Sequence, residues 1–149
     1  MIILKKDIII AGVLGGAVGN IAKLALAFIF HYLGYIDYSF GHIAAGYFIP
    51  STNINDTLSL VNGYISDFGY AGGLGILLLL ILRSTGFSFA AVKGLLLGSM
   101  IHVLNNGVLL FSNINGLPEL TPLTHFILLF PTMLFGLTTC LFLKRFYRR

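Results

Sequence analysis

The sequence predicts an all-α membrane protein in which four helices cross the bilayer. The chain has 149 residues, of which 57% are hydrophobic and only 9% are charged, and its mean hydropathy is +0.94. An average soluble domain is about 25% charged, so too few charges remain here to coat a soluble surface. The hydrophobicity also excludes a disordered chain, and the single cysteine, Cys140, excludes a disulfide scaffold.

Four stretches are long enough to span, since a transmembrane helix needs about 20 mainly apolar residues. We expect residues 1–149 to form one domain whose spans cover about residues 8–33, 64–82, 87–111 and 123–143. Runs such as Ile76–Leu82 do not alternate between apolar and polar residues, and alternation is the mark of a transmembrane β-strand. The lysines and the apolar run at the start also resemble a signal peptide, but Lys23 interrupts its apolar core, so we expect the first span to be retained.

The basic residues predict the orientation of the spans. Eight of the nine fall before the first span, around the turn between the second and third, or after the fourth: Lys5, Lys6, Arg83, Lys93, Lys144, Arg145, Arg148 and Arg149. The positive-inside rule then puts both termini in the cytoplasm. The net charge of +4 is accounted for by this topology, so we expect a lipid bilayer and no nucleic acid as partner.

The outer segment between the first two spans, residues 34–63, contains no basic residue. Its apolar part is too short to cross and ends at Pro50, which should terminate a helix at about Ile49. Its tyrosines suit the headgroup region, so we expect an interfacial or re-entrant helix. Asn55 or Asp56 is suited to cap a helix that begins near Thr57. The segment is either a surface for a partner or a lid over the helix ends.

Small residues recur at helical spacing in every span, which is typical of close helix–helix contact in lipid. Packing alone explains these glycines, and it predicts a tight bundle. The candidate packing positions are Gly12, Gly16, Gly69, Gly73, Gly94, Gly98 and Gly136.

Among the ionisable residues of the spans, three are candidates for one polar cluster: Lys23, Asp67 and His102. Counted from the cytoplasmic span ends, all three lie at a depth of roughly 23 Å. We therefore expect them to meet, with Asn20, Asn105 and Asn106 completing their hydrogen bonds. Three interpretations stay open: an ion or proton relay, a salt bridge that fixes helix register, or a lysine whose side chain reaches outward to the interface.

The four histidines fall toward the outer side, which keeps a haem or metal carrier as one alternative: His31, His42, His102 and His125. No two of them have the i, i+3 or i, i+4 spacing of a zinc site, so we expect neither metal nor cofactor. The chain also has no sequence motif of a hydrolase, a metalloprotease or a nucleotide-binding enzyme, so we expect no enzyme.

In outline the chain resembles small uncharacterised four-helix membrane proteins of Firmicutes, the YqhR-like group. The shared features are a glycine-rich first span at Gly12–Gly19, an aromatic outer segment ending in Pro50, and glycines at Gly69–Gly75 and Gly94–Gly98, with an outer loop at Asn113–Pro118. The resemblance implies the four-helix membrane fold and carries no activity.

The sequence thus predicts a multi-pass protein of the cytoplasmic membrane that acts without catalysis. We expect a self-associating or accessory subunit whose partners are copies of itself or other membrane subunits. The first alternative is a small transporter or channel component that uses Lys23, Asp67 and His102.

Overall fold

The computed structural model describes residues 7–109 and 120–147, and this part of the chain is helical without strands. Three of its helices are long and apolar enough to cross a membrane, as expected for a membrane protein. In chain order the elements are α1 (Ile8–Tyr32), α2 (Phe40–Ala45), the 3₁₀ helix η2 (Ser51–Asn53), α3 (Thr57–Thr85), α4 (Ala90–His102), the π-helix η3 (Val103–Leu109) and α5 (Pro122–Phe146).

The three long helices follow the predicted first, second and fourth spans, with local differences at their ends. Asp7 caps α1 by accepting hydrogen bonds from the backbone of Ile9 and Ile10. The span predicted over 64–82 is part of a longer helix, which begins at Thr57 directly after its N-cap Asp56 and so confirms the start and the cap that the sequence indicated. In the outer segment the short helix α2 ends at Ala45, earlier than Pro50 requires.

The third predicted span, 87–111, is the one that the structure changes most. Gly86 and Phe89 both adopt positive φ angles, 82° and 55°, so the chain turns there and α4 begins only at Ala90. After 13 α-helical residues the backbone continues as seven residues of π-helix. Residues 110–111, and the outer loop predicted at 113–118, lie outside the described residues.

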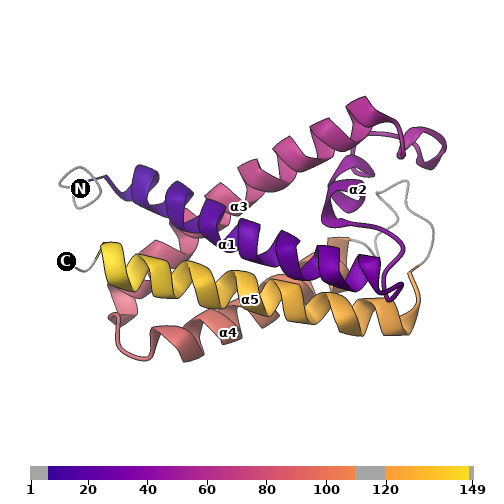
Figure 1. Cartoon of the computed structure of the whole chain (residues 1–149). Coiled ribbons are helices and arrows are strands. Elements are labelled where there is room, and N and C mark those ends of the chain that lie inside the picture. The colour runs from indigo at the N-terminus through magenta and orange to yellow at the C-terminus, as the bar shows by residue number, and fades with distance from the viewer. Residues whose placement is uncertain (1–6, 110–119, 148–149) are drawn as a thin grey trace.

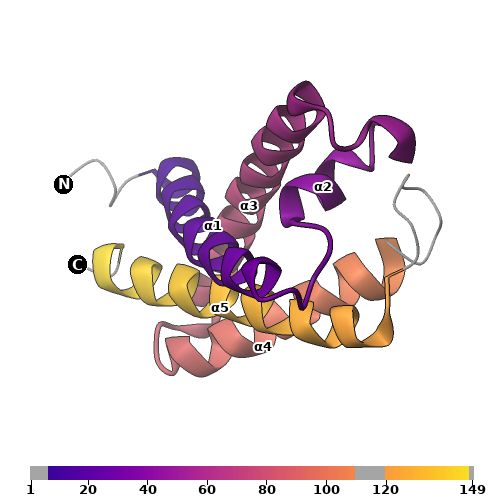
Figure 2. The same ribbon diagram turned by 45° about the vertical axis from the view of Figure 1, so that its right-hand side comes forward.

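The helices pack as two pairs that meet along α1 and α5 (Figures 1 and 2). α1 packs on α3, and α4 packs on α5, whereas α3 and α4 diverge after their connecting turn and touch little. The short helix α2 lies against the N-terminal half of α3. The start of α1, the end of α5 and the α3–α4 turn lie at the same end of the molecule (Figure 1).

Glycines form the tightest contacts in both helix pairs. A Cβ added to Gly75 on α3 would collide with the backbone of Gly12 and Gly16 on α1. On the other pair, Gly136 faces the backbone of Gly94 and Gly98 in the same way. All of these glycines except Gly75 are predicted packing positions, and those five therefore serve contacts within the chain.

The other two predicted packing glycines lie elsewhere. A Cβ added to Gly69 or Gly73 on α3 would meet no atom within 4 Å. These two positions form an open face of α3 and join no helices within the described residues.

Candidate functional site

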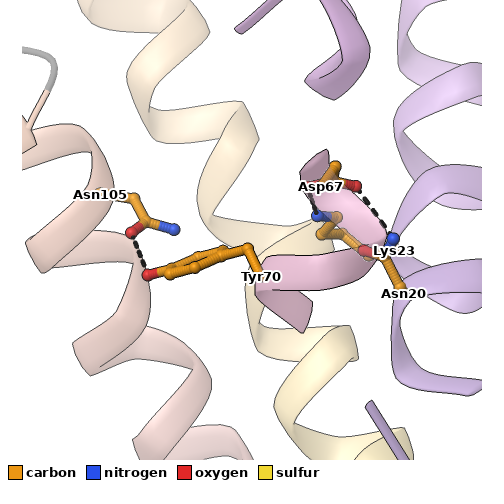
Figure 3. A network of polar contacts seen from close by, with 5 residues as sticks. All are labelled: Asn20, Lys23, Asp67, Tyr70 and Asn105. Atoms are coloured by element: carbon orange, nitrogen blue, oxygen red, sulfur yellow. Dashed lines mark hydrogen bonds and ion pairs between the residues drawn. The ribbon is translucent and has the colours of Figure 1, made fainter. Parts of the chain in front are cut away.

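A buried ion pair connects α1 to α3. Lys23 Nζ lies 2.6 Å from Asp67 Oδ1, and the two residues are only 7% and 6% exposed. The Asn20 side-chain amide donates a hydrogen bond of 2.9 Å to the other carboxylate oxygen, Asp67 Oδ2 (Figure 3). Both oxygens of the carboxylate thus have a donor, which is the condition for keeping such a charge in an apolar interior.

The local sequence explains why these side chains meet. Asn20 and Lys23 are three residues apart, so they share one face of α1. The backbone of Gly16 lies against that of Ala71, one turn after Asp67. This close approach of α1 and α3 lets the short Asp67 side chain reach across to its two partners.

The outer-segment helix α2 covers the ion pair. The Phe40 ring lies 4.3 Å from Lys23 Nζ, a distance at which the ring face attracts the ammonium group. The Gly41 carbonyl sits directly on Gly63 of α3, where any Cβ would collide with it. The outer segment was interpreted either as a lid over the helix ends or as a surface for a partner. The packing of α2 on α3 favours the lid.

Beside the ion pair lies a cavity of about 320 Å³ between α2, α3, α4–η3 and α5. Most of its wall is aliphatic or aromatic, and only Lys23 and Asp67 bring charge to it. Its lining comprises Lys23, Phe40, Ile43, Ala44, Tyr47, Phe48, Ser66, Asp67, Tyr70, Ala71, Leu74, Ile101, Asn105, Asn106, Thr132 and Phe135.

One hydrogen bond crosses the side of the cavity where α3 and η3 diverge. The Tyr70 hydroxyl donates to Asn105 Oδ1 over 2.7 Å, and Figure 3 shows the Tyr70 side chain extended from α3 toward η3. Tyr70 is 46% exposed, so its ring lies at the surface of the molecule. Tyr70 and Asn105 thus close this side of the cavity through their hydrogen bond.

His102 does not join the ion pair, contrary to the expectation that the three ionisable residues meet. Its Nδ1 lies 3.0 Å from the Asn106 amide nitrogen one turn further along, and no described hydrogen bond connects it to Lys23 or Asp67. Asn106 is buried and lines the cavity together with Asn105. The six predicted polar residues therefore divide between an ion-pair network on α1 and α3 and a second group on α4–η3.

The histidines and the cysteine show no ligand geometry in the described residues. His31 Nδ1 lies 2.8 Å from the Ile36 carbonyl, and His42 pairs with Ser39. No group of three or more His, Cys, Asp or Glu side chains in residues 7–109 and 120–147 is placed to hold a metal ion. Nothing in this geometry favours the haem or metal carrier.

The aromatic contributors to the site were not predicted from the sequence. Tyr47 is expected in the headgroup region and Phe40 in an interfacial or re-entrant helix, yet both line the cavity. The available signal for Tyr70 was its spacing of three residues from Asp67, which puts both on one face of α3.

The comparisons give no relative from which a role could be transferred. No protein-family model matches the chain, and no curated protein or solved structure matches it either.

Proposed function

We propose that the chain crosses the cytoplasmic membrane four times with both termini in the cytoplasm. The 13 residues of α4 and the seven of η3 together supply the third span along the chain, in addition to α1, α3 and α5. The common end shared by the start of α1, the α3–α4 turn and the end of α5 supports this topology (Figure 1). Arg83, Lys93 and Lys144 all belong to that end.

We further propose that the protein binds a small molecule within the membrane and acts as a non-enzymatic component of transport. The observation that carries this proposal is the 320 Å³ cavity next to the buried Lys23–Asp67 pair. Ligand pockets are typically apolar concavities with a few placed polar groups, and ionisable residues inside a membrane are rare and mark substrate or ion pathways.

The geometry favours binding over a proton relay. The Asp67 carboxylate is occupied by Lys23 and Asn20, and Phe40 covers the ammonium group. A relay needs a chain of titratable groups, whereas His102 is paired with Asn106 instead. The ion pair thus fixes the register of α1 against α3 and forms one wall of the binding site.

The test is recovery of a molecule that depends on the cavity. Ala44→Phe places a phenyl ring in the cavity, whereas Val92→Phe adds the same ring at a position that is 63% exposed and outside the cavity. The protein is purified in mild detergent, and its small molecules are identified by mass spectrometry. We expect a molecule bound to the wild type and to Val92→Phe and lost from Ala44→Phe. Equal contents in all three proteins would refute the proposal.

A second candidate function, self-association, is favoured by the open face at Gly69 and Gly73. Their spacing of four residues is the spacing at which transmembrane helices approach closely, and nothing covers either position in the described chain. A second copy is the proposed partner. Gly69→Ile with Gly73→Ile should then turn an oligomer into monomers in chemical crosslinking of native membranes, while an unchanged crosslinking pattern would refute self-association through this face.

A further inference from the structure

We infer that the ligand is a single-chain amphiphile with an uncharged head group, which reaches the cavity from the bilayer between α3 and η3. The inference rests on the proposed binding function and names its ligand class. Three properties of the cavity carry it: its size, its charge and the side on which it is closed by Tyr70.

The size selects one chain. A volume of about 320 Å³ lies at the lower end of the range of roughly 300–1,000 Å³ found for ligand pockets. Such a space suits a single acyl or prenyl chain, and it excludes full burial of a two-chain phospholipid. Ile43, Leu74, Ile101 and Phe135 provide the apolar wall for that chain.

The charge of the wall selects an uncharged head. Lys23 and Asp67 are the only charged side chains of the lining, and each neutralises the other over 2.6 Å. A charged head group would enter this apolar space without a counter-charge, which is strongly unfavourable. A hydroxyl or ester head requires hydrogen bonds only.

Polar groups suited to such a head are present on the wall. Asn105 Oδ1 accepts from Tyr70, while no described residue accepts a hydrogen bond from its amide nitrogen. Ser66 also lines the cavity, and its hydroxyl has no described partner. These groups offer one amide donor and one hydroxyl that either donates or accepts, which matches a glycerol or alcohol head.

The arrangement of the helices indicates access from the lipid. α3 and η3 belong to helices that scarcely touch beyond their connecting turn, and Tyr70 is the side chain that bridges them. Tyr70 and Phe48 are both exposed cavity residues, so within a membrane they face acyl chains. An amphiphile already in the bilayer reaches this side without crossing water.

The chain contains no tryptophan, so one introduced residue reports on its own surroundings. Tyr47→Trp places the reporter at the cavity, and Leu96→Trp places a control reporter on a face that is exposed and outside it. Each protein is reconstituted in phosphatidylcholine vesicles, and quenching is measured with four bromine-labelled probes. The probes are a monoacylglycerol, an alkyl sulfate and an alkyltrimethylammonium of equal chain length, and a two-chain phosphatidylcholine.

We expect saturable quenching of Tyr47→Trp by the monoacylglycerol alone at low mole fraction. The two charged probes should need at least about tenfold more, which corresponds to about 1.4 kcal/mol. The Leu96→Trp reporter should be quenched by every probe in proportion to its amount. Ala44→Phe, added to Tyr47→Trp, should abolish the saturable component.

Equal quenching by charged and uncharged probes, or by one-chain and two-chain lipids, would overturn the inference. If Tyr47→Trp does not fold, Phe48→Trp at the same cavity takes its place as reporter. A polar molecule lost from Ala44→Phe in mass spectrometry, without saturable quenching, would refute the ligand class and leave the binding function standing. Absence of any cavity-dependent binding in both experiments would refute both.

Discussion

Lys23 and Asp67 carry opposite charges and are buried together, so removing either charge alone destabilises the protein. Removing one partner leaves the other charge buried and uncompensated, which in proteins costs about 3–5 kcal/mol. Replacing both by apolar residues of similar size removes the two desolvation penalties together. The two kinds of substitution therefore separate a structural pair from a functional one.

We predict that Lys23→Met lowers the free energy of unfolding by about 3–5 kcal/mol and that Lys23→Met with Asp67→Leu restores most of it. Thermal unfolding in detergent measures both. A single variant as stable as the wild type would contradict the packing role of the pair. A double variant that folds and loses the bound molecule would show that the ion pair also contributes to the binding wall.

A second prediction concerns His42, which lies in α2 outside the spanning helices. The backbone N–H of Ser39 donates to His42 Nδ1, so this nitrogen must be unprotonated. Burial, and then the nearby His31, lower the pKa of His42 from its ordinary value of 6.5, although a hydrogen bond with Asn55 acts in the opposite direction. Because the unfolded state binds the proton first as the pH falls, the stability of the α2 region should decrease below about pH 6.5.

Hydrogen exchange of the α2 amides at pH 7.5 and pH 5.5 measures this effect when each rate is divided into the intrinsic exchange rate at the same pH, and smaller protection factors are expected at the lower pH. His42→Gln is the matched control, since glutamine at the same helix position accepts the same hydrogen bond without titrating. If the pH dependence persists in His42→Gln, another group is responsible.

At the scale of the helices, whether a glycine-to-alanine substitution destabilises the protein depends on whether that glycine lies in a helix–helix contact. Gly75→Ala pushes a Cβ into the backbone of Gly12 and Gly16, which cannot move aside as a flexible side chain would. Gly73→Ala, two residues away on the same helix, meets no atom within 4 Å. Alanine is also about 1 kcal/mol more favourable than glycine in a helix.

We therefore predict that Gly75→Ala lowers the thermal unfolding temperature in detergent, while Gly73→Ala leaves it unchanged or raises it. The two variants share a helix and a chemical change, so their difference reports on the α1–α3 contact alone. Equal unfolding temperatures would mean that α1 and α3 adjust without loss.

The sequence gives the level of each polar residue along its helix but not its direction around the bundle. Counting depth put Lys23, Asp67 and His102 at one level, and the structure pairs the first two. Gly94 and Gly98 hold α4 against α5, and the imidazole of His102 pairs with Asn106 of its own helix instead. The π-helix also could not be predicted, because Asn105, Asn106 and Gly107 in η3 indicate a weakened helix without indicating a π-helix in particular. The contact of Phe40 with Lys23 could not be predicted either, because the sequence does not show where α2 folds back onto the spanning helices.

At the scale of the whole molecule, the proposed topology predicts which side of the membrane each exposed residue faces. Ser84 is exposed at the end of α3 beside the α3–α4 turn, and Thr52 is exposed in η2 at the opposite end. In a background of Cys140→Ala, a membrane-impermeant thiol reagent added to intact cells should label Thr52→Cys and spare Ser84→Cys. Lysed cells should label both. The reverse pattern would invert the topology.

The hydrogen bond between Tyr70 and Asn105 has a consequence for the time the cavity spends open. A side-chain hydrogen bond inside a membrane contributes about 0.6 kcal/mol on average and at most about 1.7 kcal/mol, which is one to three times the thermal energy. At equilibrium, a substantial minority of the protein therefore has this hydrogen bond broken and Tyr70 turned away from Asn105. No helix has to unfold or shift for this to happen. The protein would exchange its ligand with the bilayer at the pace of a side-chain rotation, and its occupancy would follow the local lipid composition continuously.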